Sequence, residues 1–315
     1  MIRTVNFTDT RRSTMGPYPL LRKQGFIADN GGETTPFVWR GRLLRIEMAW
    51  GADAVTEKAA AANCGVIRDL RTGEALSGPV ARGHRFMTAF CENDTVTVFS
   101  TLRNKVYGHV SADLREWETY TALTFPEEFE LFNTAVCGDG KAYHMAIECD
   151  AAAGRENPFI GVPFTVFFAH GPDLRRLTLA PFDEAFGKDR YVSCPTLHYA
   201  DGWYYMISDE ALPFYRFVPY IFRTADFRTW EVGAINPVLW YSEEDRRPAE
   251  GYAFPPEFLQ RVQTEMDANV SDAELCEFEG KTYLLYCTGN QWSCGGVVCE
   301  AVFDGPLPRF LASFF

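Results

Sequence analysis

The stretch Phe278-Glu279-Gly280-Lys281 is followed at once by the apolar run Thr282-Tyr283-Leu284-Leu285-Tyr286. A two-residue turn with glycine or aspartate beside a run of aromatic and β-branched residues is typical of a β-hairpin. The same order of turn and strand occurs four more times, with turns at Trp39-Arg40-Gly41-Arg42, Glu92-Asn93-Asp94-Thr95, Gly138-Asp139-Gly140-Lys141 and Ala200-Asp201-Gly202-Trp203. We therefore expect five repeated β units.

A second repeated motif follows the third strand in three of these units. It reads Asp113-Leu114-Arg115-Glu116-Trp117, Asp173-Leu174-Arg175-Arg176-Leu177 and Asp226-Phe227-Arg228-Thr229-Trp230. Each unit thus contains three strands and a weak outer strand, and 315 residues divided among five units give 63 residues for each. A four-stranded sheet repeated around an axis is a propeller blade. We predict an all-β, five-bladed β-propeller that forms a single domain over residues 1–315.

One helical insertion is expected between blades four and five. Pro255 and Pro256 suit the first turn of a helix, and Glu257 complements the helix dipole there. One face of this helix carries the apolar residues Phe258, Leu259, Val262 and Met266. The helix either packs against the side of the propeller or forms a lid over its binding face.

Composition excludes several classes of protein. The 30 Lys+Arg and 42 Asp+Glu residues give a formal charge of −12, which would repel a nucleic-acid backbone. No apolar stretch reaches the roughly 20 residues of a membrane span, and no export signal is visible. The nine cysteines lack CxxC spacing, which argues against a disulfide framework or a zinc ribbon. We predict a soluble, cytoplasmic protein with reduced thiols and without nucleic-acid or membrane partners.

Polar residues gather where the innermost strand of each blade begins and the second strand ends. Because these two strands are antiparallel, both points lie at the same end of the propeller axis. Positions about eight residues from the turn glycines, or six in the case of Glu47, should lie at this end. The carboxylates at these positions are Glu33, Glu47, Glu148, Asp209, Glu210 and Asp272. Glu274 lies one pleat deeper. The same count adds the polar residues His84, Arg85, Asn133 and Gln291 and, at the rim, Trp50 and Trp292.

Two interpretations of these carboxylates remain open. Carboxylates confined near an axis repel one another and lose water, so at least one should have a raised pKa, as a general acid requires. Alternatively, acidic residues at strand ends cap loops or pair with arginines such as Arg45 and Arg85. Of Asp272 and Glu274, one is expected to anchor a buried hydrogen bond and the other to face the funnel. Tryptophan at the rim suits stacking against a sugar ring.

Other chemistries are not indicated. The sequence lacks a GxSxG nucleophile motif, a GxxxxGK[ST] phosphate loop and an HExxH zinc motif. The five histidines do not show a metal-ligand spacing. We therefore predict no cofactor and no metal ligands.

Three segments carry a family resemblance. The segment Asn269-Val270-Ser271-Asp272-Ala273-Glu274-Leu275 with the following Phe278-Glu279-Gly280-Lys281 resembles the last blade of five-bladed propeller glycosidases related to glycoside hydrolase families 43 and 117. Phe132-Asn133-Thr134-Ala135 with Met145-Ala146-Ile147-Glu148, and Pro195-Thr196-Leu197-His198 with Tyr204-Tyr205-Met206, resemble their middle blades. The resemblance implies a propeller fold and hydrolysis of an oligosaccharide substrate.

The chain departs from the family pattern at each catalytic position. Family 43 enzymes carry carboxylates where this sequence has Thr35-Pro36, Asn133-Thr134 and Ser193-Cys194-Pro195. A hydrolase would therefore need acids at neighbouring positions. The leading prediction is a glycoside hydrolase that acts at a chain end, with Glu47 as base, Glu210 as acid and Glu148 orienting or tuning the acid. The alternatives are a non-catalytic carbohydrate-binding propeller and a scaffold that binds proteins through an apolar face.

Overall fold

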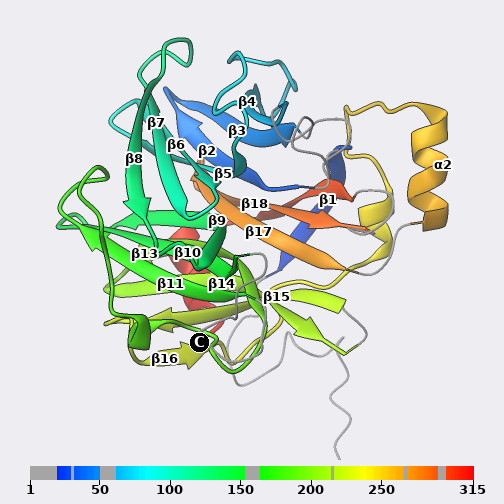
Figure 1. The fold of residues 1–315 in the computed structure, drawn as a ribbon. Helices are drawn as coiled ribbons and strands as arrows, with labels where there is room; N and C mark the ends of the chain where they lie inside the picture. The colour runs from blue at the N-terminus through cyan, green and yellow to red at the C-terminus, as the bar shows by residue number, and fades with distance from the viewer. Residues whose placement is uncertain are drawn as a thin grey trace, which may run out of the picture.

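The computed structural model describes residues 20–29, 32–49, 62–152, 164–213, 216–265, 269–289 and 296–315. They form five antiparallel sheets around a common axis, as Figure 1 shows. The predicted all-β, five-bladed propeller is confirmed.

Blades 2, 3 and 4 have four strands each, and the innermost strand comes first in the sequence. Blade 2 contains β5 (Arg85–Glu92), β6 (Thr95–Leu102), β7 (Lys105–Ser111) and β8 (Glu118–Thr124). Blade 3 contains β9 (Phe129–Gly138), β10 (Tyr143–Ala151), β11 (Thr165–Gly171) and the short β12 (Thr178–Leu179), which is followed by the 3₁₀ turn η2 (Phe182–Glu184). Blade 4 contains β13 (Val192–Ala200), β14 (Trp203–Leu212), β15 (Arg216–Thr224) and β16 (Trp230–Val232).

Blade 1 has three regular strands, β2 (Thr34–Trp39), β3 (Arg42–Ala49) and β4 (Cys64–Asp69). Residues 74–80 lie beside β4 and bond to it irregularly, since Leu76 N donates to Ile67 O at 2.8 Å and Gly65 and Val80 exchange both of their backbone hydrogen bonds. The fourth strand predicted from the repeat is therefore present here only as isolated bridges.

Blade 5 joins the two ends of the chain. Its inner strands are β17 (Val270–Phe278), β18 (Lys281–Thr288) and β19 (Val297–Phe303), and its outermost strand is β1 (Leu21–Ala28) from the beginning of the described chain. Phe26 of β1 lies opposite Cys299 of β19. The ring is thus closed by main-chain hydrogen bonds between segments that are far apart in sequence, a feature that the repeat pattern alone did not predict.

The hairpin turns follow the expected chemistry. Asp201 and Gly202 have φ values of 49° and 85°, and Ala200 pairs with Trp203 across the turn. Two central residues with positive φ match the right-handed twist of the flanking strands. The turns at Gly41, Asn93 and Gly280 are built in the same way.

A β-bulge interrupts the innermost strand of four blades near the axial end. The register shifts fall between Arg85 and Thr88 in β5, between Ser193 and Thr196 in β13 and between Ser271 and Glu274 in β17. The β9 bulge places Phe132 and Asn133 opposite Glu148. A bulge bends the strand and re-aims a side chain. The bulges of β5, β13 and β17 contain Phe86, Cys194 and Asp272, and all three residues have positive φ values, between 49° and 54°.

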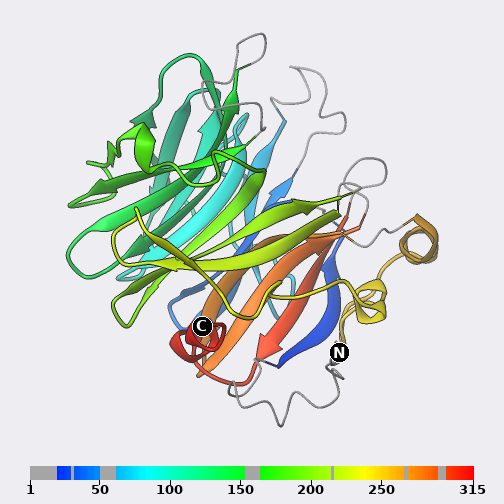
Figure 2. The same cartoon turned by 90° about the horizontal axis from the view of Figure 1, so that it is seen from below.

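The predicted insertion is helix α2 (Pro256–Glu265), after the 3₁₀ turn η3 (Glu243–Arg246). Phe258 and Val262 of α2 are buried, and the Phe258 ring lies 5.8 Å from that of Phe26 in the outermost strand of blade 5. The helix therefore packs against the side of the propeller, as Figure 1 shows (gold). Met266 lies outside the described residues. A second helix, α3 (Leu307–Ala312), follows β19 and lies beside blade 5 (Figure 2, red).

The core is divided among the spaces between adjacent blades. One cluster joins blades 4 and 5 through residues such as Ile207 and Leu284, and another joins blades 1 and 2 through Ile46 and Val98. Each blade therefore depends on its neighbours for burial. The eight cysteines within the described ranges form no disulfide. Among the described helices none has the length and apolar character to span a membrane.

Candidate active site

Five carboxyl groups meet at one end of the axis. We call them the axial carboxyl cluster: Glu33 directly before β2, Glu148 in β10, Asp209 in β14, and Asp272 and Glu274 in β17. Asp272 acts electrostatically on each of the other four. Within the described ranges, no lysine or arginine forms an ion pair with any member of the cluster.

A small cavity lies among these groups. Its walls include Glu33, Asn133, Cys194, Asp272 and Glu274, and its volume is about 10 Å³. A cavity of this size holds about one water molecule. The side chains therefore surround one small polar site on the axis.

Two members of the cluster bind the backbone of the next blade. Glu148 Oε2 accepts hydrogen bonds from Cys194 N at 2.7 Å and from Asn133 Nδ2 at 3.1 Å. Asp209 Oδ2 accepts one from Asp272 N at 3.1 Å. In both cases the N–H belongs to a bulge residue with positive φ. Glu148 and Asp209 are 3% and 1% exposed, so these bonds are shielded from water.

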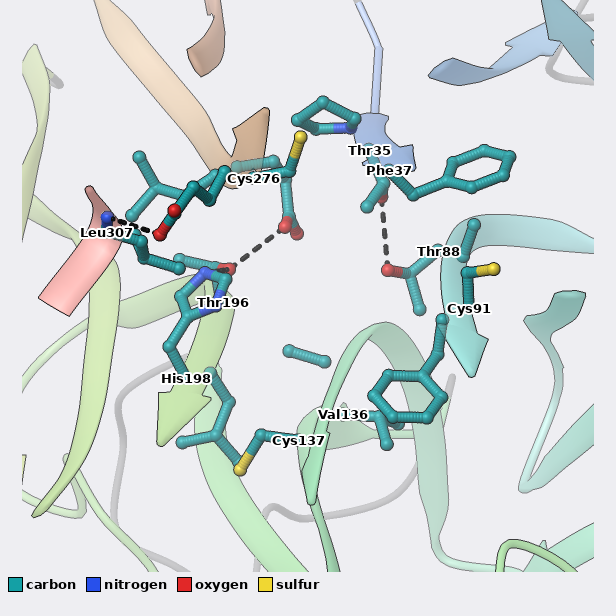
Figure 3. A pocket seen from close by; sticks show the side chains of 18 of the residues that line it. Thr35, Phe37, Thr88, Cys91, Val136, Cys137, Thr196, His198, Cys276 and Leu307 are labelled. Carbon is teal, nitrogen blue, oxygen red and sulfur yellow. Dashed lines mark hydrogen bonds between the residues drawn. The ribbon is translucent and has the colours of Figure 1, made fainter. Parts of the chain in front are cut away.

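Asp272 and Glu274 have different surroundings. Ser271 Oγ donates to Asp272 Oδ2 at 2.6 Å, and Asp272 lines only the small cavity. Thr196 Oγ1 donates to Glu274 Oε2 at 2.9 Å, and Glu274 also reaches a second cavity of about 330 Å³ further along the axis. Figure 3 shows this second cavity, with the Thr196 bond as a dashed line and His198 beside it.

Burial raises the pKa of every member of the cluster. Loss of water is the largest cause, and it raises the pKa of Glu33, Glu148 and Glu274 to about 8 each. The pKa values of Asp209 and Asp272 are also raised, again mainly by burial. A negative charge on Asp272 raises the pKa of Glu33 further. The cluster therefore holds protons at neutral pH, which a general acid requires.

Two carboxyl oxygens of the cluster lack a hydrogen-bond partner among the described residues. They are Glu33 Oε2 and Asp209 Oδ1, and both atoms are buried. Unpaired buried polar atoms are rare, and they concentrate at sites that bind a ligand, water or an ion. A carboxylate oxygen of Asp209, one of Asp272 and Cys194 Sγ also lie within 4.8 Å of one another, so this corner of the site contains three potential metal ligands.

Four of the residues predicted for the site have other partners. Glu47 pairs with Arg45 and Arg68, and Glu210 pairs with Arg190 at 2.9 Å. Arg85 pairs with Glu130 at 2.6 Å, and His84 Nδ1 lies 2.8 Å from Ser100 Oγ. None of the four lines the small axial cavity. Pairing between strand-end acids and arginines was the alternative left open by the sequence, and it describes Glu47 and Glu210.

Strand geometry explains why Asp209 and Glu210 have different surroundings. Successive side chains on a strand point to opposite faces. Asp209 reaches Asp272 of blade 5, whereas Glu210 reaches Arg190. Counting residues from a turn glycine does not resolve this difference, since a shift of one residue reverses the face.

The remaining predictions divide into two groups. Asn133, Glu148, Asp209, Asp272 and Glu33 come together at the axis, whereas Trp50, Gln291 and Trp292 lie outside the described residues. Sequence reasoning missed Cys194 as a component of the site. Its signal was present in Ser193-Cys194-Pro195, the segment that the resemblance seen in the sequence aligns with a catalytic motif of family 43.

Comparison with known proteins yields matches at the level of structure. No protein-family model matches the sequence, and no curated protein matches it at a significant level. A solved structure described as a glycoside hydrolase aligns with a TM-score of 0.61 at 12% identity, over 97% of each chain. An α-L-arabinofuranosidase from Podospora anserina, solved with cellotriose, aligns with a TM-score of 0.59 at 9% identity, over 92% of this chain and 98% of its own.

A β-fructofuranosidase from Bombyx mori aligns with a TM-score of 0.56 at 11% identity, over 89% of this chain and 61% of its own. At such low identities these likenesses show a common fold. The chain is thus a five-bladed β-propeller of the architecture found in these glycoside hydrolases.

Proposed function

We propose that the protein is a glycoside hydrolase whose acid–base chemistry is performed by Glu33 and Asp272. The observation that carries this proposal is that Glu33 and Asp272 both line the small axial cavity, where burial and, next in size, the charge on Asp272 raise the pKa of Glu33 to about 8. The fold shared with solved glycoside hydrolases supports the reaction class. Most enzymes of this class use two carboxyl groups beside the scissile bond.

Two coupled carboxyl groups can divide the two roles between them. When one of them is ionised, its charge favours the protonated form of the other. The protonated group donates to the leaving glycosidic oxygen, while the ionised one activates water or attacks the anomeric carbon. Glu148 contributes a further charge that raises the pKa of Glu33. The ion pairs of Glu47 and Glu210 favour Glu33 and Asp272 for the chemistry itself.

We further propose action at the end of an oligosaccharide chain. The basis for this is that the carboxyl cluster lies at one end of the propeller axis, where the innermost strands converge, so that an opening there would admit the end of a chain rather than its middle. The sugar and the linkage are left to a substrate screen.

The proposal is tested by hydrolysis of a panel of aryl glycosides and oligosaccharides. Wild-type protein is compared with Glu33→Gln, Asp272→Asn and Glu148→Gln, and with Glu127→Gln as an exposed control. Glu47→Gln and Glu210→Gln test the assignment made from sequence. Turnover that falls at least about 100-fold in Glu33→Gln and Asp272→Asn supports the pair. Wild-type turnover in Glu33→Gln and Asp272→Asn would refute the proposed pair. Loss of turnover in Glu47→Gln or Glu210→Gln would favour Glu47 as base and Glu210 as acid, as predicted from the sequence.

A second function, non-catalytic carbohydrate binding, is favoured by one specific observation. By the resemblance seen in the sequence, Asn133 and Ser193 stand where family 43 enzymes carry carboxylates, and Asn133 Nδ2 donates a hydrogen bond to the neighbouring Cys194 Sγ. Calorimetry with the same oligosaccharides distinguishes the two functions. Binding without turnover in wild-type protein would establish the binding module.

A further inference from the structure

Three side chains with metal-binding chemistry meet at one corner of the axial cavity. Cys194 of β13, Asp209 of β14 and Asp272 of β17 place a sulfur and two carboxylate oxygens within 4.8 Å of one another. Cys194 and Asp272 are the bulge residues of adjacent blades, with φ values of 49° and 54°. The backbone is therefore held in an unfavourable conformation that brings these side chains together.

Asp209 supplies an independent reason to look for a ligand. Its side chain is 1% exposed, and its Oδ2 accepts the hydrogen bond from Asp272 N. Its other oxygen, Oδ1, is buried and has no hydrogen-bond partner among the described residues. A buried carboxylate oxygen without a partner is unfavourable unless a donor or a cation satisfies it.

Positive charge is absent from the immediate surroundings. Five carboxyl groups occupy the axis, and within the described part of the chain none of them forms an ion pair with a basic side chain. Buried charges in proteins are generally paired or coordinate a metal. Protons neutralise these groups when no metal is bound, and a divalent cation would displace protons from its ligands and supply the positive charge itself.

We propose that Cys194, Asp209 and Asp272 bind a thiophilic divalent cation, and that Zn²⁺ fits the site best. A thiolate ligand selects zinc over magnesium or calcium, which prefer sites made of oxygen atoms alone. Zinc binds sulfur at about 2.3 Å and carboxylate oxygen at about 2.0–2.2 Å, so the three ligand atoms, which lie within 4.8 Å of one another, would draw closer together around the cation. Three protein ligands leave the fourth position of a tetrahedral site to water, for which the adjoining cavity has room.

Residues around the three proposed ligands form hydrogen bonds that would orient Cys194 toward the cation. Asn133 Nδ2 donates to Cys194 Sγ at 3.2 Å and to Glu148 Oε2 at 3.1 Å. Glu148 in turn holds Cys194 N at 2.7 Å. Hydrogen bonds to metal ligands orient them and commonly change metal affinity by about 10–100-fold. This network fixes the position of Cys194.

The cation also bears on catalysis, and this part of the inference rests on the proposed function. A carboxylate that coordinates zinc is not available as an acid, a base or a nucleophile, so Asp272 could not then serve in the proposed pair. Zinc is therefore expected to inhibit hydrolysis by removing one member of the acid–base pair. Metal binding itself does not depend on whether the protein hydrolyses a glycoside.

Cobalt and zinc test the site directly. Chelator-treated, full-length protein is titrated with Co²⁺ and followed by absorption, because a thiolate ligand produces a near-ultraviolet charge-transfer band. Zn²⁺ binding is measured by calorimetry on the same sample. Cys194→Ser and Asp209→Asn remove one ligand each. Cys276→Ser is the matched control, since Cys276 is also a partly buried thiol on an innermost strand but lines the other cavity. Circular dichroism establishes that each variant is folded.

The expected result is one bound cation for each chain, with the cobalt band present in wild type and Cys276→Ser and absent in Cys194→Ser. Zinc affinity should fall by more than about tenfold in Cys194→Ser and in Asp209→Asn. Three outcomes would overturn the proposal: no binding to folded wild-type protein, a cobalt band that persists in Cys194→Ser, or equally tight binding of Mg²⁺ or Ca²⁺. Hydrolysis measured with and without chelator then tests the proposed function separately.

Discussion

The backbone N–H of Cys194 donates a hydrogen bond of 2.7 Å to Glu148 Oε2, so a side chain of blade 3 holds the bulge residue of blade 4. The same relationship recurs one blade further, where Asp209 holds Asp272 N. A buried carboxyl group thus fixes each bulge, and the bulge in turn directs a side chain toward the axis. The shape of the axial cavity therefore depends on contacts between blades.

This relationship predicts the cost of removing Glu148. Glu148→Ala leaves Cys194 N and Asn133 Nδ2 without their acceptor, and each unpaired buried donor costs about 1–3 kcal/mol. Glu148→Gln retains a carbonyl oxygen and should cost distinctly less. Urea denaturation of the two variants measures the difference, and equal free energies of unfolding would show that the hydrogen bonds do not matter.

The raised carboxyl pKa values predict that stability declines as pH rises. Glu33, Glu148 and Glu274 keep their protons in the folded protein up to a pKa of about 8, whereas the unfolded chain releases them near the ordinary value of 4.5. The folded state therefore binds more protons between these values, so the free energy of unfolding falls through this range, by up to about 1 kcal/mol per pH unit for each group.

Denaturation at a series of pH values checks this slope. Glu274→Gln removes one titrating group and keeps an acceptor for Thr196 Oγ1, so its slope should be shallower than that of the wild type. The exposed control Glu127→Gln should keep the wild-type slope. A wild-type stability that rises with pH across this range would contradict the raised pKa values.

Asp272→Asn is expected to lower the pKa of Glu33. Burial is the largest cause of the raised value and the charge on Asp272 is the second, so the pKa should move down from about 8 without reaching its ordinary value. Titration of labelled glutamate carboxyl carbons by NMR, in the presence of a chelator, measures the change. An unchanged pKa would mean that the two groups do not interact.

A buried ion pair joins β1 to the 3₁₀ turn η3. Lys23 Nζ of β1 lies 2.6 Å from Asp245 Oδ2, and Tyr286 OH donates to Asp245 Oδ1 at 2.6 Å. Asp245 is 0% exposed. Asp245→Ala leaves the lysine without its partner, which costs about 3–5 kcal/mol for a buried pair.

The effect should be concentrated in β1. Hydrogen exchange of the β1 amides is expected to accelerate more than that of blade 3, because β1 is held at the edge of blade 5. Glu118→Gln, which removes an exposed partner of Arg175, should leave the melting temperature unchanged. An equal acceleration of amide hydrogen exchange in all blades of Asp245→Ala would show that the ion pair does not act specifically on β1.

Local sequence signals were sufficient for the repeat architecture. The turn at Asp201-Gly202 and its counterparts have the dihedral angles that their residues favour, and the apolar runs after them form the expected strands. Helix α2 also lies where Pro256 and the Phe258–Val262 spacing predicted it. Such features depend on neighbours a few residues away, so the chain encodes them directly.

The composition of the axial end was predictable in part. Antiparallel pairing places the start of one strand beside the end of the next, and this rule brought Glu33, Asn133, Glu148, Asp209 and Asp272 together. It did not separate Asp209 from Glu210, or show that Glu47 binds two arginines. Arg45 lies two residues before Glu47 on the same face of β3, whereas Arg68 belongs to β4 and meets Glu47 only in the folded sheet.

The sequence by itself determined the number of blades, their turns and the end of the axis where acids collect, because these follow from local periodicity and turn chemistry. Tertiary structure decided which side chains face the cavity, since bulges at Cys194 and Asp272 shift the strand register. It also decided that β1 completes blade 5. The physical reason is that side chains alternate between the two faces of a strand, so one extra residue at a bulge changes which face each later side chain occupies.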